Sequence, residues 1–253
     1  MRIQAAGAGA GVRMEDAGGR AGRERIQTAG LRPRLAMAAE LVSPGVVVAD
    51  IGTDHAYLPI HLVRAGVSPR AIASDIREGP LRNAAKAVGR AGLERRIELR
   101  LSDGFSRFTL CDAGCWVLAG MGGTLIARLL ESAPWLCAPG TALVLQPMRH
   151  AWEVRAWLCA HGFRIEKEAA CYDANRPYHA IRAAYDSPLS TLHSQIYTYT
   201  GELPQLAHPA AKELLARERA LLRTRAEALE NCGRAGEELA RLRIILRDWP
   251  EST

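Results

Sequence analysis

Three sequence signals that would assign a chain of this size to a functional class are missing. The six cysteines form no C-x-x-C pair, so their spacing does not predict a zinc site or another metal site. No apolar stretch is as long as a membrane span, and no apolar core of a signal peptide lies near the N-terminus. A glycine repeat of the G-x-G-x-x-G type, which marks a dinucleotide-binding loop, is also missing. We therefore expect a cytoplasmic protein with reduced thiols and no membrane association.

The composition fits a folded protein with one large domain, or one medium domain and an appendage. Apolar residues make up 48% of the 253 residues, which is enough for a substantial core. The net charge of +6 is mild. It permits a nucleic acid as partner, but ordinary solubility explains it equally well. Nothing in the pattern predicts an obligate protein partner.

The first 30 residues differ from the rest of the chain. They are rich in glycine, alanine and arginine and have little apolar periodicity. Such a segment cannot bury enough surface to offset the entropy lost on ordering. We predict that residues 1–30 form a disordered extension.

Between residues 31 and 186, strand and helix patterns alternate, which is typical of a parallel α/β sheet. The predicted strands are Val46–Asp50, Ala71–Asp75, Ile97–Leu101, Cys115–Ala119 and Ala142–Gln146. The predicted helices are Leu35–Val42, Ala56–Ala65 with Asp54 as its N-cap, Pro80–Ala91, one from Thr124, and Trp152–His161.

Two further segments are expected after this alternation. Phe163–Cys171 and Tyr178–Tyr185 read as strands with a short polar loop between them, so they must pair in antiparallel fashion. In residues 187–253, leucines approach a heptad spacing over Ala210–Glu230 and again from Leu239 to Trp249. This pattern predicts an antiparallel helical hairpin appended to the α/β domain.

The segment VVVADIGTDHAYLP, residues 46–59, carries the clearest functional signal. A predicted strand ends in Asp50, turns at Gly52 and passes Asp54 and His55 before a helix begins. A loop of this kind binds a small cofactor at the carboxyl end of a parallel sheet. Its two acids would repel a phosphate, whereas an amine and a sulfonium would tolerate them, and S-adenosylmethionine has both. For His55, a cofactor contact and a supporting role remain equally open.

The next strands also end at residues suited to a cofactor. Asp75 can accept hydrogen bonds from ribose hydroxyls, and Asp103 can accept one from an adenine amine beside Gly104. After the fourth strand, Gly120 to Gly123 leave room for a flat substrate beside the backbone. This loop lacks the Asn/Asp-Pro-Pro-aromatic motif of enzymes that methylate exocyclic amines, so a ring nitrogen suits it better.

Several motifs in order resemble the bacterial tRNA (adenine-22-N1) methyltransferases. They are ADIGTDHAYLP (49–59), SDIREGP (74–80), SDG (102–104), AGMGG (119–123), LQPM (145–148) and the turn at Arg176-Pro177-Tyr178. The resemblance covers about residues 31–249. It implies a Rossmann-like class I methyltransferase sheet over 31–186, with an antiparallel last strand, and a helical hairpin over 187–253. It also implies that S-adenosylmethionine methylates N1 of an adenine in tRNA.

The same resemblance implies roles for individual residues. Those expected around the cofactor are Asp50, Gly52, Asp54, His55, Asp75, Ile76, Asp103 and Gly104. Those expected at the target base are Gly120, Met121, Gly122 and Gly123, with Asp54 as one group that could stabilise the cationic product. Those expected to contact the substrate are Arg34, Arg176 and Tyr178.

Other functions stay open at this point. The chain could methylate another RNA site or a small metabolite, or it could be a non-catalytic RNA-binding module that keeps the fold. A nicotinamide-dependent dehydrogenase is disfavoured by the missing glycines.

Overall fold

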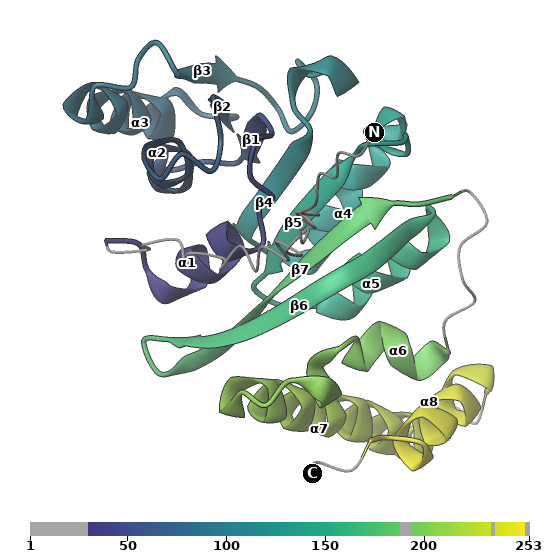
Figure 1. Cartoon of the computed structure of the whole chain (residues 1–253). Helices are drawn as coiled ribbons and strands as arrows, with labels where there is room; N and C mark the ends of the chain where they lie inside the picture. Colours follow the sequence, from purple (N-terminus) through teal and green to yellow (C-terminus); the bar gives the residue numbers. More distant parts are fainter. Residues whose placement is uncertain (1–29, 188–193, 234–235, 251–253) are drawn as a thin grey trace, which may run out of the picture.

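The computed structural model describes residues 30–187, 194–233 and 236–250, and its centre is a seven-stranded sheet (Figure 1). The strand order is β3-β2-β1-β4-β5-β7-β6. The first five strands of the chain run parallel, and β7 pairs antiparallel with both β5 and β6. The strands are β1 Val48–Ile51, β2 Ala71–Asp75, β3 Ile97–Leu101, β4 Cys115–Met121, β5 Ala142–Pro147, β6 Phe163–Asp173 and β7 Arg176–Tyr185. The predicted sheet is confirmed.

Helices cover both faces of this sheet because side chains alternate between the faces along each strand. Val48 and Val117 pack with residues of α1 and α2, while Trp116 and Leu118 pack with residues of α4 and α5. Helix α3 packs beside α2 against β2 and β3. The helices are α1 Pro33–Glu40, α2 Tyr57–Arg64, α3 Glu78–Ala91, α4 Gly123–Glu131, α5 Ala151–Ala160, α6 Gln195–Thr200, α7 Pro209–Asn231 and α8 Glu237–Arg247.

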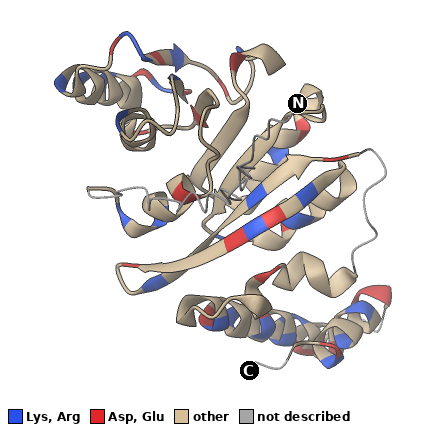
Figure 2. Ribbon diagram, in the orientation of Figure 1, with Lys and Arg blue, Asp and Glu red and all other residues tan. Residues whose placement is uncertain are grey.

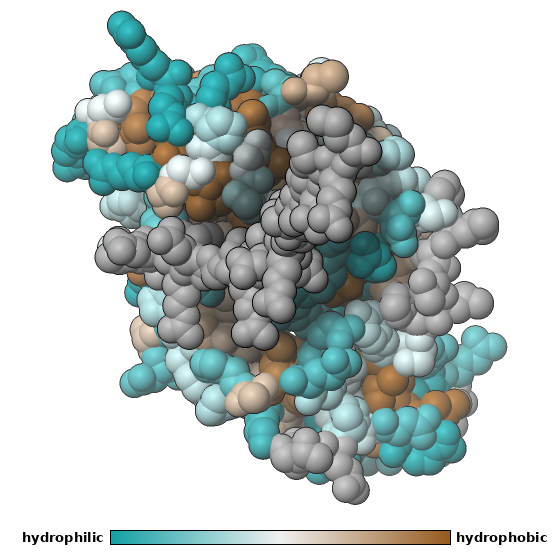
Figure 3. All heavy atoms as spheres, in the orientation of Figure 1, coloured by the Kyte–Doolittle hydropathy of each residue, from teal (hydrophilic) through white to brown (hydrophobic). Residues whose placement is uncertain are grey.

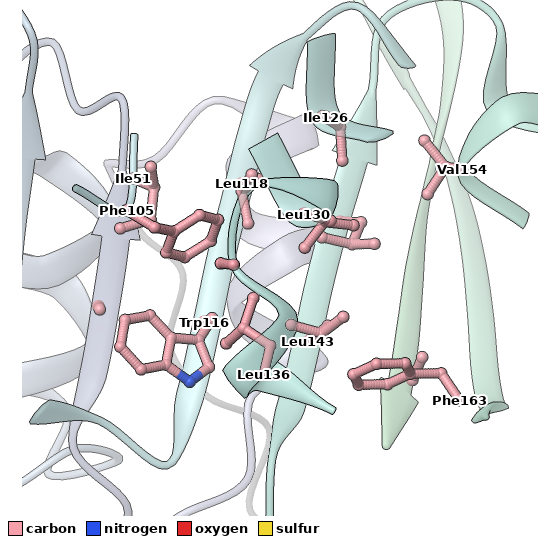
Figure 4. Close-up of a cluster of buried hydrophobic side chains, with 14 of the residues drawn as sticks. Ile51, Phe105, Trp116, Leu118, Ile126, Leu130, Leu136, Leu143, Val154 and Phe163 are labelled. Carbon is pink, nitrogen blue, oxygen red and sulfur yellow. The ribbon is translucent and has the colours of Figure 1, made fainter. Parts of the chain in front are cut away.

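An aromatic cluster fills the core beneath α4. Trp116 is fully buried and meets Phe105, Phe108 and Trp135 edge to face, at centroid distances of 5.7, 5.5 and 5.2 Å. Figure 4 shows Phe105 beside Trp116, with Leu136 and Leu143 on the neighbouring elements. Such edge contacts add to the free energy gained by burying the rings. The cluster holds the segment after β3, including Gly104, against the sheet.

The strands β6 and β7 form a long hairpin that is closed by a tighter turn than predicted. Ala174 and Asn175 connect them with φ angles of +49° and +59°. Two consecutive residues with positive φ form the turn that matches the twist of an antiparallel pair. Pairing therefore extends to Asp173 and Arg176, beyond the predicted strand ends. Figure 2 shows positive and negative residues alternating along β6, where Glu166 pairs with Arg182.

The helices α7 and α8 pack against each other and form the predicted C-terminal hairpin. Figure 1 shows α7 beside the β6–β7 hairpin and α8 against α7, and Figure 3 shows hydrophilic and hydrophobic residues intermixed over the lower part of the molecule, where these helices lie. Trp152 of α5 stacks on Tyr199 of α6, the helix that precedes α7, at 5.8 Å between ring centroids. None of the helices in the described part of the chain is long and apolar enough to cross a membrane.

A buried ion pair ties α5 and the end of α6 to the sheet. Arg155 of α5 donates to both carboxylate oxygens of Glu168 on β6, at 2.7 and 3.0 Å, and both side chains are almost fully buried. The guanidinium also donates to the carbonyl of Tyr199 at 3.2 Å. Gly201 passes so close that a Cβ there would overlap Arg155 and Glu168. This cluster fixes the place where the chain leaves α6.

Some local predictions were wrong. Asp54 does not cap α2; the helix begins after Ala56, whose φ is +54°, and Thr53 Oγ1 accepts a hydrogen bond from the Ala56 N–H at 3.1 Å. Helix α6 was not predicted, because six residues are too few to show a period. The prediction of disorder for residues 1–30 falls, apart from Gly30, outside the described residues.

Candidate functional site

Three acids lie at or just after the carboxyl ends of three neighbouring strands, as the sequence predicts. Asp50 is in β1, Asp75 ends β2, and Asp103 follows β3. The loops are tied together by backbone hydrogen bonds: Gly52 and Thr53 donate to the Ser74 carbonyl at 2.8 and 2.7 Å. These bonds hold the loop after β1 against the end of β2. A ligand at this edge of the sheet can therefore reach all three strands.

Asp50 is buried at this edge, and its pKa is shifted. Burial raises the pKa of its carboxyl to about 6, and the nearby Asp75 adds to the shift, while a hydrogen bond with the Thr53 side chain opposes it. The side chain is only 7% exposed, and no cation is paired with it within the described residues. A positively charged ligand stabilises the ionised form of a buried carboxylate that has no other counter-ion. The amine of an amino-acid moiety is such a group.

Asp75 is also buried but already has a partial set of partners. Its Oδ1 accepts a hydrogen bond from the Arg77 N–H at 2.8 Å, and Arg77 Nε lies 3.7 Å away. No partner for Oδ2 was found among the described residues, so this oxygen is available to a ligand. Ile76 follows directly and is 58% exposed, which is unusual for an isoleucine. Together they present an acceptor and an apolar surface, as a ribose and a flat ring require.

The glycine-rich segment at the end of β4 lies against the loop after β1. Gly52 has a φ of +81°, and the terminal methyl group of Met121 occupies the space that a Cβ at position 52 would need. Gly120 has a φ of +79° and sits where the pairing of β4 with β5 shifts by one residue. Its N–H donates to Oε1 of the buried Gln146 at 3.1 Å. Sequence reasoning had not placed Gln146 at the site, although it lies in the LQPM motif.

The glycines at 122 and 123 have different surroundings. Gly122 is exposed, and a Cβ there would meet nothing within 4 Å. Gly123 is buried; its N–H donates to the Arg149 carbonyl at 2.8 Å, and a Cβ would overlap the backbone of His150. Gly123 thus lets α4 begin against the loop that precedes α5. Its predicted contact with a target base stays a prediction, and this packing is a structural reason for a glycine there.

Arg34 is brought to this loop from the start of α1. Its Nη1 lies 3.6 Å from Met148 Sδ and 3.5 Å from the position of a Cβ at Gly120. The structure thus joins Arg34 and Gly120, which are far apart in the sequence. Arg176 is exposed at the tip of the β6–β7 hairpin, and the half-buried Tyr178 packs on the cluster that includes α1. Their predicted substrate contacts stay predictions.

The remaining predicted residues lie at the rim. His55 Nε2 is 3.3 Å from Asp54 Oδ2, and its ring stacks on Tyr57 at 5.0 Å between centroids. Tyr57 is 54% exposed and was not identified from the sequence. Gly104 has a φ of +50°, and a Cβ there would overlap Leu129 of α4. No group of three or more potential metal-ligating side chains occurs in the described ranges.

Comparisons with known proteins agree with this geometry. A curated relative, the tRNA (adenine(22)-N(1))-methyltransferase of Bacillus subtilis, is 37% identical over 149 residues, which are 56% of this chain and 63% of the relative. The crystal structure of the B. subtilis M1A22 tRNA methyltransferase has a TM-score of 0.74 and 28% identity, covering 86% of this chain and 96% of that one. A putative tRNA (m1A22) methyltransferase from Streptococcus pneumoniae, in complex with S-adenosyl-L-methionine, has a TM-score of 0.71 and 33% identity, covering 84% and 98%.

The family assignment rests on a separate comparison. The family model described as a methyltransferase domain matches residues 31–181, which contain all five parallel strands and most of the β6–β7 hairpin. The matched region includes every acid and glycine of the site described above. The chain belongs to the methyltransferase domain family.

Proposed function

We propose that this protein transfers a methyl group from S-adenosylmethionine to N1 of an adenine in tRNA, at position 22 as in the relatives. The observation that carries the proposal is the buried Asp50, which pairs with no cation among the described residues and lies beside Asp75 and across from the glycine-rich segment. This arrangement suits a ligand with a cationic amino-acid end, a ribose and an adenine. Phosphate-bearing dinucleotides suit it less well.

The residues fit the cofactor part by part. Asp50 would bind the amine, and Asp75 would accept hydrogen bonds from the ribose hydroxyls, with the exposed Ile76 against the adenine. Asp103, exposed after β3, would accept a hydrogen bond from the adenine amine. When bound, the cofactor supplies an electrophilic sulfonium methyl group. The proposed cofactor site thus uses the ends of three neighbouring strands.

Methyl transfer to adenine N1 requires the protein mainly to position the two reactants. Adenine N1 has a lone pair in the plane of the ring, so no proton has to be removed before attack. Catalysis would come from holding the base in line with the methyl group and excluding water. The glycines at 120 and 122 leave backbone open to a flat ring. The base must leave its stack to reach them.

Methyl transfer to unmodified tRNA tests the proposal. The protein is incubated with S-adenosylmethionine labelled in the methyl group and with unmodified transcripts, and the labelled nucleoside is identified. We expect 1-methyladenosine. Asp75→Ala should abolish cofactor binding and transfer, whereas Asp186→Ala, which removes an exposed acid at the end of β7, should leave both unchanged. Labelling of free nucleosides or of another base would favour the alternative substrates.

Two companion measurements address the other functions. Calorimetry with NAD and with S-adenosylmethionine separates a dehydrogenase from a methyltransferase, and we expect heat of binding only with the latter. Retention of RNA binding and of cellular phenotype by Asp75→Ala would favour a non-catalytic RNA-binding module. A cytoplasmic location, where tRNA is available, belongs to the same proposal.

A further inference from the structure

Arg34 has a buried anionic partner that comes from a distant part of the chain. Asp173 ends β6, and its Oδ2 lies 3.3 Å from Arg34 Nε and 3.7 Å from Arg32 Nε. The Asp173 side chain is 7% exposed and that of Arg34 22% exposed, whereas Arg32 is 65% exposed. Burial excludes most water from the Asp173–Arg34 pair, so this pair is stronger than an ordinary surface contact.

The hairpin turn determines where this carboxylate lies. Ala174 and Asn175 make the turn, and Asp173 faces Arg176 as the last pair of the ladder. Helix α1 packs against both strands of this hairpin. Asp173 is therefore held by a rigid strand end rather than by a free loop. The guanidinium of Arg34 is fixed between this strand end and the loop of Gly120.

The other side of the guanidinium faces the proposed target site. With Nε directed to Asp173, Arg34 Nη1 reaches Met148 Sδ and the space beside Gly120. Resting on the proposed function, we propose that Asp173 is a positioning residue that orients Arg34 to bind the phosphate of the nucleotide being methylated. A guanidinium matches phosphate in both charge and geometry.

Charge balance supports a paired arginine at this place. Methylation at adenine N1 turns a neutral base into a cation. An arginine without a partner beside that base would oppose the developing charge, as like charges do at short range. The carboxylate of Asp173 compensates Arg34, so that the arginine can bind a phosphate without raising the barrier. Removing the carboxylate should therefore harm both tRNA binding and the chemical step.

A double-mutant cycle tests this inference. The variants are Asp173→Asn, Arg34→Ala and the double variant, and the measurements are kcat and KM for tRNA, the tRNA dissociation constant, the S-adenosylmethionine dissociation constant and Tm. We expect Asp173→Asn to weaken tRNA binding by about tenfold and to lower kcat, with cofactor affinity unchanged. In the Arg34→Ala background the same change should alter tRNA affinity less than about twofold.

The matched control is Asp186→Asn, an exposed acid of the same hairpin whose carboxylate lies 3.6 Å from Arg164, and it should behave as wild type. Equal losses from Asp173→Asn with and without Arg34 would overturn the inference, because they would assign Asp173 a purely structural task. Unchanged tRNA affinity in the single variant would overturn it as well. If Asp173→Asn lowers Tm strongly, the pair is tested instead with Arg34→Gln, which removes the charge of the arginine. Unchanged tRNA affinity in Arg34→Gln would contradict the inference. If the wild type fails to methylate tRNA, the proposed function is wrong. The tRNA dissociation constants of the variants then still show whether Asp173 acts through Arg34.

Discussion

Met121 reaches from the end of β4 to Gly52 in the loop after β1, and its terminal methyl group fills the space where a Cβ at position 52 would lie. The contact joins the predicted cofactor loop to the predicted target-base loop. Gly52 is therefore required for two reasons, its φ of +81° and the close approach of Met121. A substitution at either residue should therefore affect both the predicted cofactor loop and the predicted target-base loop.

The first prediction concerns Gly52→Ala. The left-handed backbone costs an alanine about 1–2 kcal/mol, and Met121 has to move as well. We expect cofactor affinity to fall by about tenfold or more, measured by calorimetry, with a modest fall in Tm. Met121→Ala in the same protein should recover only part of this loss, because the backbone strain remains. Full recovery would show that the methionine contact, not φ, is what requires the glycine.

The second prediction separates the two neighbouring glycines 122 and 123. Gly123→Ala places a methyl group on the backbone of His150, which cannot move aside as a side chain can. We expect it to destabilise the protein by roughly 1–3 kcal/mol, the usual cost of overpacking. Gly122→Ala is the matched control and should leave stability unchanged, since its Cβ meets nothing within 4 Å. Urea denaturation measures both, and equal stability of the two variants would contradict the packing described for Gly123.

The third prediction is a pH dependence of cofactor binding. Burial raises the pKa of Asp50 to about 6, so the carboxyl is mostly protonated at pH 5 and ionised above pH 7. The ionised form attracts the cofactor amine, so affinity should rise by about tenfold from pH 5 to pH 7.5. Asp50→Asn should bind weakly and lose this dependence. A dissociation constant that is flat with pH in the wild type would exclude Asp50 as the group facing the amine.

The same carboxyl affects the stability of the protein without ligand. Its pKa in the folded state lies above the ordinary aspartate value of 3.8, so the folded state binds the proton more tightly. Stability from this group is therefore present at low pH and is lost as pH rises from about 4 through 6. A bound cation restores it, and the increase in Tm on adding S-adenosylmethionine should be larger at pH 7.5 than at pH 5.

The fourth prediction concerns the buried pair of Arg155 and Glu168. Glu168→Gln leaves a guanidinium uncompensated in the interior and should destabilise the protein by roughly 3–5 kcal/mol. Replacing both residues by apolar ones of similar size, as in Arg155→Met with Glu168→Leu, should cost much less. Glu166→Gln, on the same strand but in a more exposed pair with Arg182, is the control and should cost less than about 1 kcal/mol. A similar effect of Glu168→Gln and Glu166→Gln in urea denaturation would contradict the anchoring role.

The site was predictable where it depends on strand ends. Asp50, Asp75 and Asp103 follow apolar runs that read as strands, and parallel strands bring their carboxyl ends to one edge of a sheet. Gly52 was predictable as a turn residue, because it follows the first strand pattern, and the structure gives it a φ of +81°. Local patterns thus predicted the acids that follow these strands, and the structure adds the strand order that brings them to one edge of the sheet.

The parts that escaped prediction depend on contacts between distant residues. Asp173 meets Arg34 only because the β6–β7 hairpin folds back beside α1, and no local pattern shows this. Asp54 was expected to cap α2 because its residue type favours that position, but the neighbouring Thr53 satisfies the Ala56 N–H instead. No local sequence pattern shows that Arg155 and Glu168 form a buried pair. Buried charges are visible only once the partner elements are in place.

Mapping the modified nucleotide tests the central claim most directly. An unmodified tRNA with adenine at position 22 and the same tRNA with guanine there are each treated with the protein and S-adenosylmethionine, digested and analysed by mass spectrometry. The account predicts one 1-methyladenosine per molecule, located at position 22, in the first tRNA and none in the second. Methylation of another atom or position, or no methylation by a protein that binds the cofactor, would contradict it.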